Sequence, residues 1–169
     1  MITRTGAAIG LLGLAGAMTL AAAAARANAP PTVSCTEIVG RFRSGHAAGY
    51  RVVLGTVSVP PAYRPQVVPS RIKAWPFLKK AGIAVRGGSR AVVVTVPKAW
   101  RSRAAISWGD SAIGSGLRIA SCPAFLPPEV WNAYAGGFYL RSRSACVPLT
   151  FRVGRRTQTV RFGLAKHCA

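Results

Sequence analysis

The sequence predicts an all-β fold, an antiparallel β-sandwich of about seven or eight strands, and three observations lead to this prediction. Short runs rich in β-branched residues recur along the chain, and 18 Gly and 12 Pro separate them. Segments with helical periodicity and helix caps are scarce. The C-terminal segment alternates apolar and polar residues, as two paired strands do. An immunoglobulin-like arrangement is one form that such a sandwich takes.

The first strand-like segments follow the N-terminal third of the chain. Residues 50–59 (YRVVLGTVSV) carry apolar groups on both alternating faces, which predicts one strand covered on two sides. Residues 60–70 (PPAYRPQVVPS) contain four prolines, and these favour a loop or an extended sheet edge.

The middle of the chain contains two pairs of strand-like segments and one ambiguous stretch. Segments 82–86 and 91–96 flank a GGS triplet and predict a hairpin, and segments 104–108 and 116–121 flank a second turn. Residues 123–140 fit either a short helix that begins at Pro128 or an aromatic strand from Trp131 to Tyr139. We expect a loop or helical turn up to about Asn132 and a strand after it.

The C-terminal hairpin, formed by residues 147–153 and 158–164, is the clearest element. A tight turn at residues 155–156 would pair Phe151 with Val160 and place the apolar side chains of both strands on one face. The opposite face would then be basic and exposed to solvent, with Thr150, Arg152, Thr159 and Arg161. A slip of one residue would exchange the two faces, so the assignment of faces is strongly specified.

The N-terminus resembles a secretory signal peptide. Arg4 precedes an apolar run from residue 7 to residue 25, and small residues follow it, so we expect cleavage near residues 27–29. The alternative is an uncleaved membrane anchor, because the run has nearly the length of a membrane span. We therefore divide the chain into a signal peptide, residues 1–29, and a single mature domain, residues 30–169, which has no further transmembrane segment and which we expect to be secreted or associated with the cell wall.

Four cysteines, all in the mature part, predict two disulfides, because an even number of cysteines in an exported chain usually forms a disulfide framework. No CxxC pair is present, so a metal site is not expected. Three pairings are possible. Cys122 with Cys146 and Cys35 with Cys168 are favoured, because the hairpin register above places Cys146 opposite Ala165, three residues short of Cys168.

The charge of the chain is strongly positive, with 23 Lys and Arg against 3 Asp and Glu and a formal net charge of +20. The few carboxylates exclude paired-carboxylate glycosidases, EF-hand calcium sites and two-metal carboxylate centres, all of which need clustered acidic residues. The sequence also contains no phosphate-binding loop, dinucleotide-binding glycine motif or HExxH motif, so we expect no cofactor.

One short motif suggests catalysis. Gly109-Asp110-Ser111 superficially resembles the GDS block of secreted esterases and part of the GDSGG segment around a trypsin-like nucleophile. The partner residues do not fit, because Leu164 stands where the esterase class has an acid before His167. A cluster of His46 with Asp110 and Ser111 is a further alternative, but a turn between strands explains the triplet without catalysis. We therefore expect no catalytic residues.

The excess of positive charge is the strongest indication of function. Arginine is the preferred side chain for bidentate recognition of phosphate and carboxylate groups. An exported cation-rich protein meets wall polymers, acidic polysaccharides and lipid headgroups, whereas nucleic acid is a less favoured partner. The candidate anion-binding residues lie near the C-terminus: Arg141, Arg143, Arg152, Arg155, Arg156 and Arg161.

Residues 131–164, followed by a final Cys, and the block VPKAWRSRAAISWG resemble small exported proteins of high-GC Gram-positive (actinobacterial) bacteria whose function is unknown. The resemblance implies a compact, disulfide-bearing β domain and export, and it supplies no activity or binding residue. The sequence thus predicts a secreted, basic, non-enzymatic binding module for an anionic extracellular or cell-envelope partner. The alternatives are a structural cell-envelope protein and a small serine hydrolase that uses Ser111.

Overall fold

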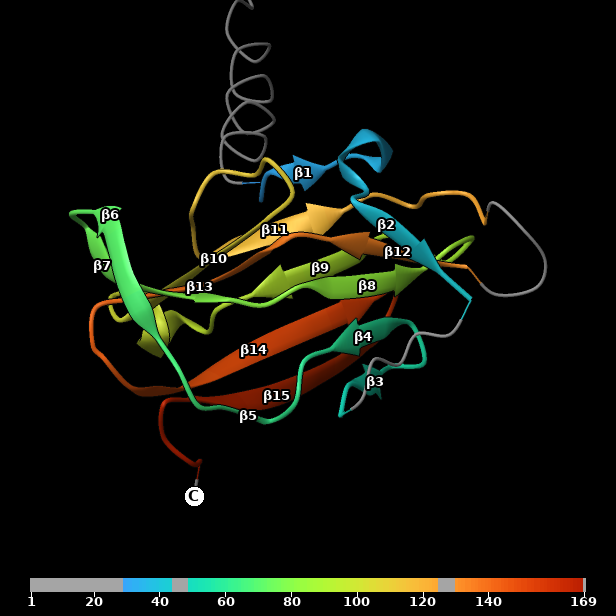
Figure 1. Ribbon diagram of the computed structural model, residues 1–169. Coiled ribbons are helices and arrows are strands. Elements are labelled where there is room, and N and C mark those ends of the chain that lie inside the picture. The colour runs from blue at the N-terminus through green and yellow to red at the C-terminus, as the bar shows by residue number, and fades with distance from the viewer. Residues whose placement is uncertain (1–28, 44–48, 125–129, 169) are drawn as a thin grey trace, which may run out of the picture.

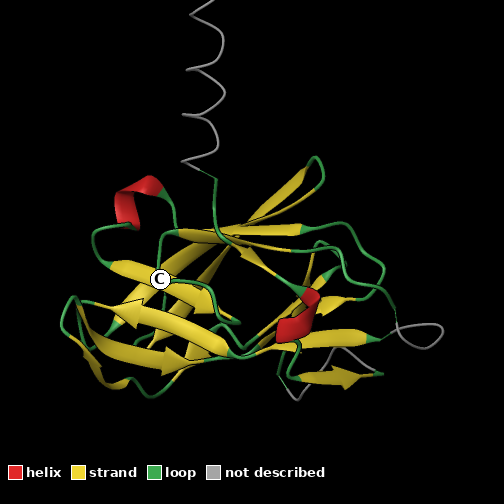
Figure 2. Ribbon diagram, turned by 90° about the horizontal axis from the view of Figure 1, so that it is seen from above, coloured by secondary structure: helices red, strands yellow, loops and turns green. Residues whose placement is uncertain are grey.

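The computed structural model describes residues 29–43, 49–124 and 130–168, and it confirms the all-β, sandwich-like fold. In these ranges the regular structure consists of β-strands and two short 3₁₀ turns, η1 (Cys35–Glu37) and η2 (Lys98–Trp100), which lie well apart on the strand framework (Figure 2). The predicted signal peptide lies almost entirely outside the described residues, and His46 and Pro128 lie outside them as well.

A six-stranded sheet contains the longest strands of the molecule (Figure 1). Its interior pairs are antiparallel, and both of its edge strands pair parallel to their neighbours. In spatial order its strands are β1 (Thr32–Val33), β11 (Gly116–Ile119), β9 (Val92–Thr95), β14 (Ala145–Val153), β15 (Arg156–Leu164) and β5 (Tyr63–Arg64).

Two smaller sheets complete the fold, so the described strands form three sheets, whereas an immunoglobulin domain has two. The five-stranded sheet has the order β2 (Gly40–Phe42), β12 (Trp131–Tyr134), β8 (Ile83–Arg86), β4 (Val57–Val59) and β3 (Arg51–Val53). The four-stranded sheet has the order β10 (Ala104–Trp108), β13 (Gly136–Leu140), β7 (Trp75–Lys80) and β6 (Val68–Ile72).

The chain passes twice between the two smaller sheets, and the two passages lie against each other. One runs from β7 to β8 through Ala81 and Gly82, and the other runs from β12 to β13 through Ala135. The amide of Ala81 donates to the carbonyl of Gly136 at 2.9 Å. We call residues 81–82 and 135–136 the crossing.

The buried aromatic side chains connect the sheets in the core. The ring of Phe138 lies 5.8 Å from the ring of Trp108 and 5.2 Å from that of Phe162, which belongs to the six-stranded sheet. The indole nitrogen of Trp108 donates to the carbonyl of Ala81 at 2.8 Å. Trp108 is completely buried, so this bond satisfies its polar atom and also a backbone carbonyl of the crossing.

The C-terminal hairpin has the predicted faces but not the predicted register. Val147, Leu149 and Val160 are buried, and the opposite face with Arg152 and Arg161 is exposed, as expected. The strands pair Leu149 with Val160, so β15 is shifted by two residues from the predicted register. The turn begins at Gly154, whose φ of +59° suits the first central position of a type II′ turn. A shift of two residues leaves the faces unchanged.

Two other predictions about strand connections were wrong. Residues 50–59 form a hairpin, β3 and β4, because Leu54 and Gly55 both have positive φ and the amide of Thr56 donates to the carbonyl of Val53 at 3.0 Å, as in a type I′ turn. Segments 82–86 and 91–96 are strands but do not pair, because they belong to different sheets. The glycines between them bond elsewhere, and Gly88 donates to the carbonyl of Cys122 at 2.7 Å.

The remaining strand predictions agree with the structure in outline. The proline-rich segment 60–70 is extended at two sheet edges, as β5 and the start of β6. Strands β10 and β11 occupy segments 104–108 and 116–119 but lie in different sheets. In the ambiguous stretch a strand begins at Trp131, close to the expected start, so no helix continues past that residue, and Pro128 lies outside the described residues.

The four cysteines form two disulfides, as predicted, but the favoured pairing was wrong. Cys35 pairs with Cys122 and Cys146 pairs with Cys168. The first bond follows from the parallel pairing of β1 with β11, which aligns Val33 with Ile119 and brings the following cysteines together.

The second disulfide depends on a reversal of the chain after β15. Ala165 has a φ of +53°, and the following residues fold back over Gly163, which is the ladder partner of Cys146. A Cβ atom at Gly163 would overlap the carbonyl oxygen of Lys166 and lie 3.4 Å from the amide of Cys168. Glycine at this position therefore allows Cys168 to reach Cys146.

We predict that the two disulfides contribute unequally to stability. They close loops with sequence separations of 87 and 22 residues, and chain entropy gives about 4.6 kcal/mol for the longer loop and about 3.4 kcal/mol for the shorter one. The free energy of unfolding in urea is therefore expected to fall further in Cys35→Ser/Cys122→Ser than in Cys146→Ser/Cys168→Ser. The opposite order, or peptide maps that join Cys122 to Cys146, would contradict this assignment.

Candidate functional site

The structure places the six candidate arginines on the long C-terminal hairpin and on the loop that leads into it. All six are exposed: Arg141 and Arg143 lie in the loop before β14, and Arg152, Arg155, Arg156 and Arg161 lie on the hairpin. Because β14 has nine residues, the loop and the turn are about 30 Å apart along the strand. The six residues therefore belong to an extended surface and do not form one compact anion pocket.

The hairpin contributes its solvent-exposed face, which we call the arginine face and define by Thr150, Arg152, Thr159 and Arg161. The hydroxyl oxygens of Thr150 and Thr159 are 2.9 Å apart, in hydrogen-bonding contact across the strand pair. Arg152 of β14 is the ladder partner of Val93 in the neighbouring strand β9. On the other side of β9, Val93 is the ladder partner of Arg118 in β11. The arginine face thus continues from β15 and β14 over β9 to β11, and it combines hydroxyl and guanidinium groups.

Three further arginines adjoin the arginine face and are not among the residues predicted from the sequence. Arg118 continues it across the sheet, and a guanidinium nitrogen of Arg90 lies 3.1 Å from the position that a Cβ atom of Gly154 would take. Arg51 donates to the carbonyl of Arg161 at 3.2 Å, and its partial burial lowers its pKa. Each is an isolated cation far from the hairpin in sequence, so no local pattern identifies it.

Arginines at the other end of β14 lie against aromatic rings. The guanidinium of Arg141 is 5.3 Å from the ring centre of Trp75, and that of Arg143 is 5.8 Å from that of Phe77. These half-buried rings hold the guanidinium groups in place by cation–π contact, while the N–H groups at the guanidinium edge can still bind an anion. By contrast, Tyr134 and Phe138, which precede these arginines in the sequence, are buried in the core.

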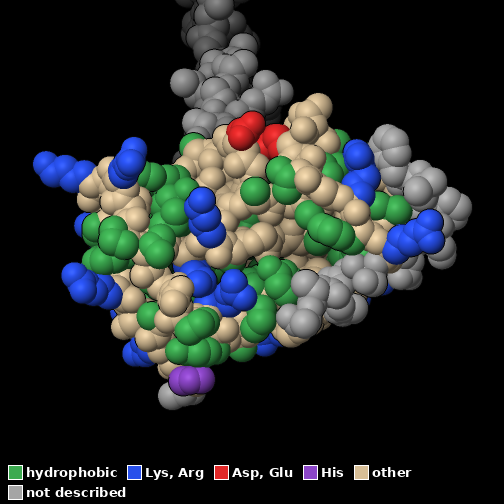
Figure 3. All heavy atoms as spheres, viewed as in Figure 1, with side chains coloured by type: hydrophobic (Ala, Val, Ile, Leu, Met, Phe, Trp, Pro, Cys, Tyr) green, Lys and Arg blue, Asp and Glu red, His purple; other side chains and the backbone are tan. Residues whose placement is uncertain are grey.

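Few carboxylates are available to neutralise these cations. The described residues include 21 of the 23 Lys and Arg but only two acidic residues, Glu37 and Asp110. In Figure 3 the cations are dispersed over the visible face, whereas the acidic side chains lie together at one edge. Most of the positive charge is therefore not balanced by acidic groups within the described part of the protein.

The Gly109-Asp110-Ser111 triplet forms a turn that is bonded to η1. The carboxylate of Glu37 accepts one hydrogen bond from the amide of Ser34 at 2.7 Å and another from the amide of Asp110 at 2.6 Å. Gly109 has a φ of +60°, and a Cβ atom on it would overlap the Glu37 carboxylate. Both hydrogen bonds favour the charged form, so the pKa of Glu37 is lowered, chiefly by the bond from Ser34.

Ser111, the candidate nucleophile of the alternative hydrolase, participates in the same turn. Its hydroxyl oxygen accepts a hydrogen bond from the amide of Trp108 at 3.3 Å, and its carbonyl accepts one from the hydroxyl of Ser107 at 2.7 Å. These are the bonds of a turn residue. His46 lies outside the described residues, and His167 stacks on Tyr63 with ring centres 4.0 Å apart.

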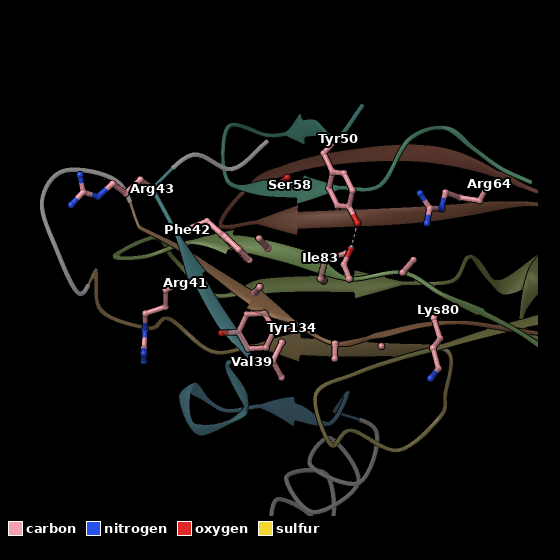
Figure 4. Close-up of a pocket in the computed structure, with 16 residues that line it drawn as sticks. Val39, Arg41, Phe42, Arg43, Tyr50, Ser58, Arg64, Lys80, Ile83 and Tyr134 are labelled. Atoms are coloured by element: carbon pink, nitrogen blue, oxygen red, sulfur yellow. Dashed lines mark hydrogen bonds between the residues drawn. The ribbon is translucent and has the colours of Figure 1, made fainter. Parts of the chain in front are cut away.

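A groove of about 820 Å³ lies over the five-stranded sheet and the crossing, and it was not predicted from the sequence. Small residues form much of its lining, including Ala84 and Ala133 of the sheet and all four residues of the crossing, and Ser58 is the hydroxyl residue among them. The rings of Phe42, Tyr50 and Tyr134 lie along it (Figure 4). The hydroxyl of Tyr50 donates to the carbonyl of Gly82 at 3.4 Å and so links β3 to the crossing.

Cations lie at both ends of the groove, and no acidic residue is among the described residues that line it. Arg41 and Arg43 lie at one end, and Arg64 and Lys80 lie at the other (Figure 4). The Nε atom of Arg64 is buried and has no hydrogen-bond partner among the described residues. Burial, and next the charge of Arg64, lower the pKa of the adjacent Lys79. At this end, therefore, cations lie close together, and the described lining residues include no carboxylate.

Burial also affects Tyr134, whose ring lies beside the groove. Desolvation is the main cause that raises the pKa of Tyr134 to about 12. The negative charge of Glu37 also raises this pKa, whereas the positive charge of Arg41 lowers it. The hydroxyl group of Tyr134 lies 3.4 Å from the Sγ atom of Cys122. Tyr134 therefore stays neutral at physiological pH and offers the groove a ring rather than a charge.

Among the described residues, no group of three or more His, Cys, Asp and Glu side chains could hold a metal ion. No described helix is long and apolar enough to span a bilayer. Comparisons with known proteins found no matching family model, no matching curated protein and no matching solved structure.

We predict that Glu37 stabilises the folded protein at neutral pH and that this contribution is lost at low pH. Since its pKa is lower in the folded state, its contribution is present above the unfolded value near 4.5 and is lost as the pH falls through the folded value. At pH 7 Glu37→Gln should lower the free energy of unfolding by about 1 kcal/mol, a value reduced for solvent exposure. Urea titrations of both proteins should show that the difference shrinks by pH 3; an equal difference at both pH values would contradict this role.

Proposed function

We propose that this protein is an exported, non-enzymatic binding module that attaches to an anionic polymer or surface outside the cell or in the cell envelope. The observation that carries the proposal is the imbalance of 21 cations against two carboxylates in the described residues. Such an imbalance creates a strong positive field, which attracts polyanions over distances comparable to the Debye length.

The arrangement of the arginines favours a polymer or surface over a small ion. A compact site for phosphate or carboxylate needs several donors that converge on one point. The candidate arginines instead extend over about 30 Å, from the loop at Arg141 to the turn at Arg155. A polyanion, which repeats its charge along its length, can contact both ends at once.

Export is supported by the signal-like N-terminus and by the use of all four cysteines in disulfides, since such bonds persist in oxidising compartments. The resemblance to small exported actinobacterial proteins agrees with this location. We favour wall polymers, acidic polysaccharides and anionic lipid headgroups as partners over nucleic acid.

The proposal predicts binding that weakens steeply with salt. Purified mature protein should bind at least one of heparin, isolated wall polymer, phosphatidylglycerol vesicles and duplex DNA. Its affinity should fall roughly tenfold or more between 50 and 200 mM salt, because cations bound to the polyanion are released when the protein binds. Absence of binding to all four probes, or binding that is insensitive to salt, would contradict the proposal.

A matched pair of variants tests whether the arginine face takes part. Arg152→Gln/Arg155→Gln removes two exposed cations from the hairpin, and the control Arg71→Gln/Lys73→Gln removes two exposed cations near the β6–β7 turn. The hairpin variant should lose affinity severalfold and have a shallower salt dependence, whereas the control should stay close to wild type. Equal losses in both variants would show that only net charge matters.

A further inference from the structure

We propose that the groove over the crossing binds a single-chain carboxylate amphiphile of the fatty-acid kind. Its carboxylate would lie at the end formed by Arg64 and Lys80, and its apolar chain would lie over Ala84 and Ala133. This site is separate from the arginine face, and the inference does not depend on the proposed binding of a polyanion.

The lining of the groove determines the body of the ligand. Its floor consists largely of Ala and Gly, and its walls include the rings of Phe42, Tyr50 and Tyr134. A sugar would require convergent amide and carboxylate side chains, and the part of the lining that the structure describes contains no Asn, Gln, Asp or Glu. Such a surface gains free energy mainly by removing apolar groups from water, so it fits a hydrocarbon chain better than a glycan.

The size of the groove favours one chain over two. About 820 Å³ lies within the range of pockets that enclose small organic ligands, which is roughly 300 to 1,000 Å³. A lipid with two acyl chains exceeds this class of ligand. A single-chain molecule can lie along the groove, between its two charged ends.

The Arg64 end is the better place for the negative group. A buried guanidinium atom without a hydrogen-bond partner costs free energy, and the buried Nε of Arg64 is such an atom among the described residues. Arg64 also lies close enough to Lys79 to disfavour the charge of the lysine, and none of the described lining residues is a carboxylate that would offset the repulsion. A ligand carboxylate at this end would offset the repulsion and could accept hydrogen bonds from Arg64 and Lys80. At the opposite end Arg41 and Arg43 are exposed.

The crossing explains why such a site can exist in a sandwich. At the crossing the chain leaves one of the smaller sheets for the other. Side chains on the outer surface there have no further described strand packed beside them. The residues there are Ala81, Gly82, Ala135 and Gly136, which leave the space unfilled. Larger side chains at these positions would close the groove.

The direct test is calorimetric titration of the mature protein with oleate below its micellar concentration, with methyl oleate and a single-chain lysophosphatidate as comparison ligands. We expect saturable binding of one oleate per protein and at least tenfold weaker binding of the uncharged ester. Equal binding of oleate and its ester, absence of saturable oleate binding, or binding of lysophosphatidate alone would each overturn the proposal.

Variants on the two parts of the groove locate the ligand. Arg64→Gln and Lys80→Gln should each weaken oleate binding about tenfold, and Ala133→Leu should abolish it by filling the floor. The matched controls are Arg71→Gln, which removes an exposed charge outside the groove lining, and Ala112→Leu, which adds the same bulk at an exposed turn residue. Controls should bind as wild type does.

Two measurements keep this test independent of folding and of polymer binding. Circular dichroism and urea unfolding should show that Lys80→Gln, whose side chain is exposed, folds as wild type does, and wild-type affinity in this variant would overturn the placement of the carboxylate. Arg152→Gln/Arg155→Gln should retain full oleate binding. If it loses oleate and polyanion binding equally, oleate binds through the general charge of the protein, and the groove assignment is wrong.

Discussion

The chain passes twice from one of the smaller sheets to the other, at residues 81–82 and at residue 135, and the two passages are hydrogen-bonded to each other. A strand that leaves its sheet loses the ladder partners of its backbone groups, and buried backbone groups must find other partners. Here Trp108 and Gly109 supply them, because the indole of Trp108 donates to the carbonyl of Ala81 and the amide of Gly109 donates to that of Ala135. The position of β10 is thereby tied to the crossing.

The same constraint fixes residue size around the crossing. A Cβ atom on Gly136 would overlap the carbonyl of Ser107, and one on Gly137 would overlap that of Lys79. Glycine is needed there because the strands approach so closely. The small side chains that permit this packing inside the molecule also leave the outer surface hollow, so the architecture and the groove have one origin.

The sequence predicted those structural properties that depend on the alternation of neighbouring residues. The alternation of residues 147–153 identified the buried and exposed faces of the hairpin, because a period of two is a property of the strand itself. Backbone conformation was harder to predict: positive φ at Gly154 sets the register, and positive φ at Leu54 divides an apparent strand into two. Leucine seldom adopts a positive φ, so the residue type at position 54 did not indicate the turn between β3 and β4.

The features that depend on distant segments could not be predicted. The disulfide between Cys146 and Cys168 requires the reversal at Ala165, and the one between Cys35 and Cys122 requires a parallel strand pair 87 residues apart in the sequence. Arginines of the candidate surface were predicted by type, but Arg51, Arg90 and Arg118 joined them only through the fold. The groove had no signal at all, since alanine and glycine carry no recognisable chemistry.

The small number of carboxylates has a consequence for the charge of the protein at different pH values. Most cations are arginines, which do not release their protons under biological conditions, and protonation of every carboxylate and histidine would add at most five charges to the net of +20. The protein therefore keeps nearly the same net charge in acidic solution as in neutral solution. Under the proposed function, a change in attachment across that pH range would therefore report the titration of the partner.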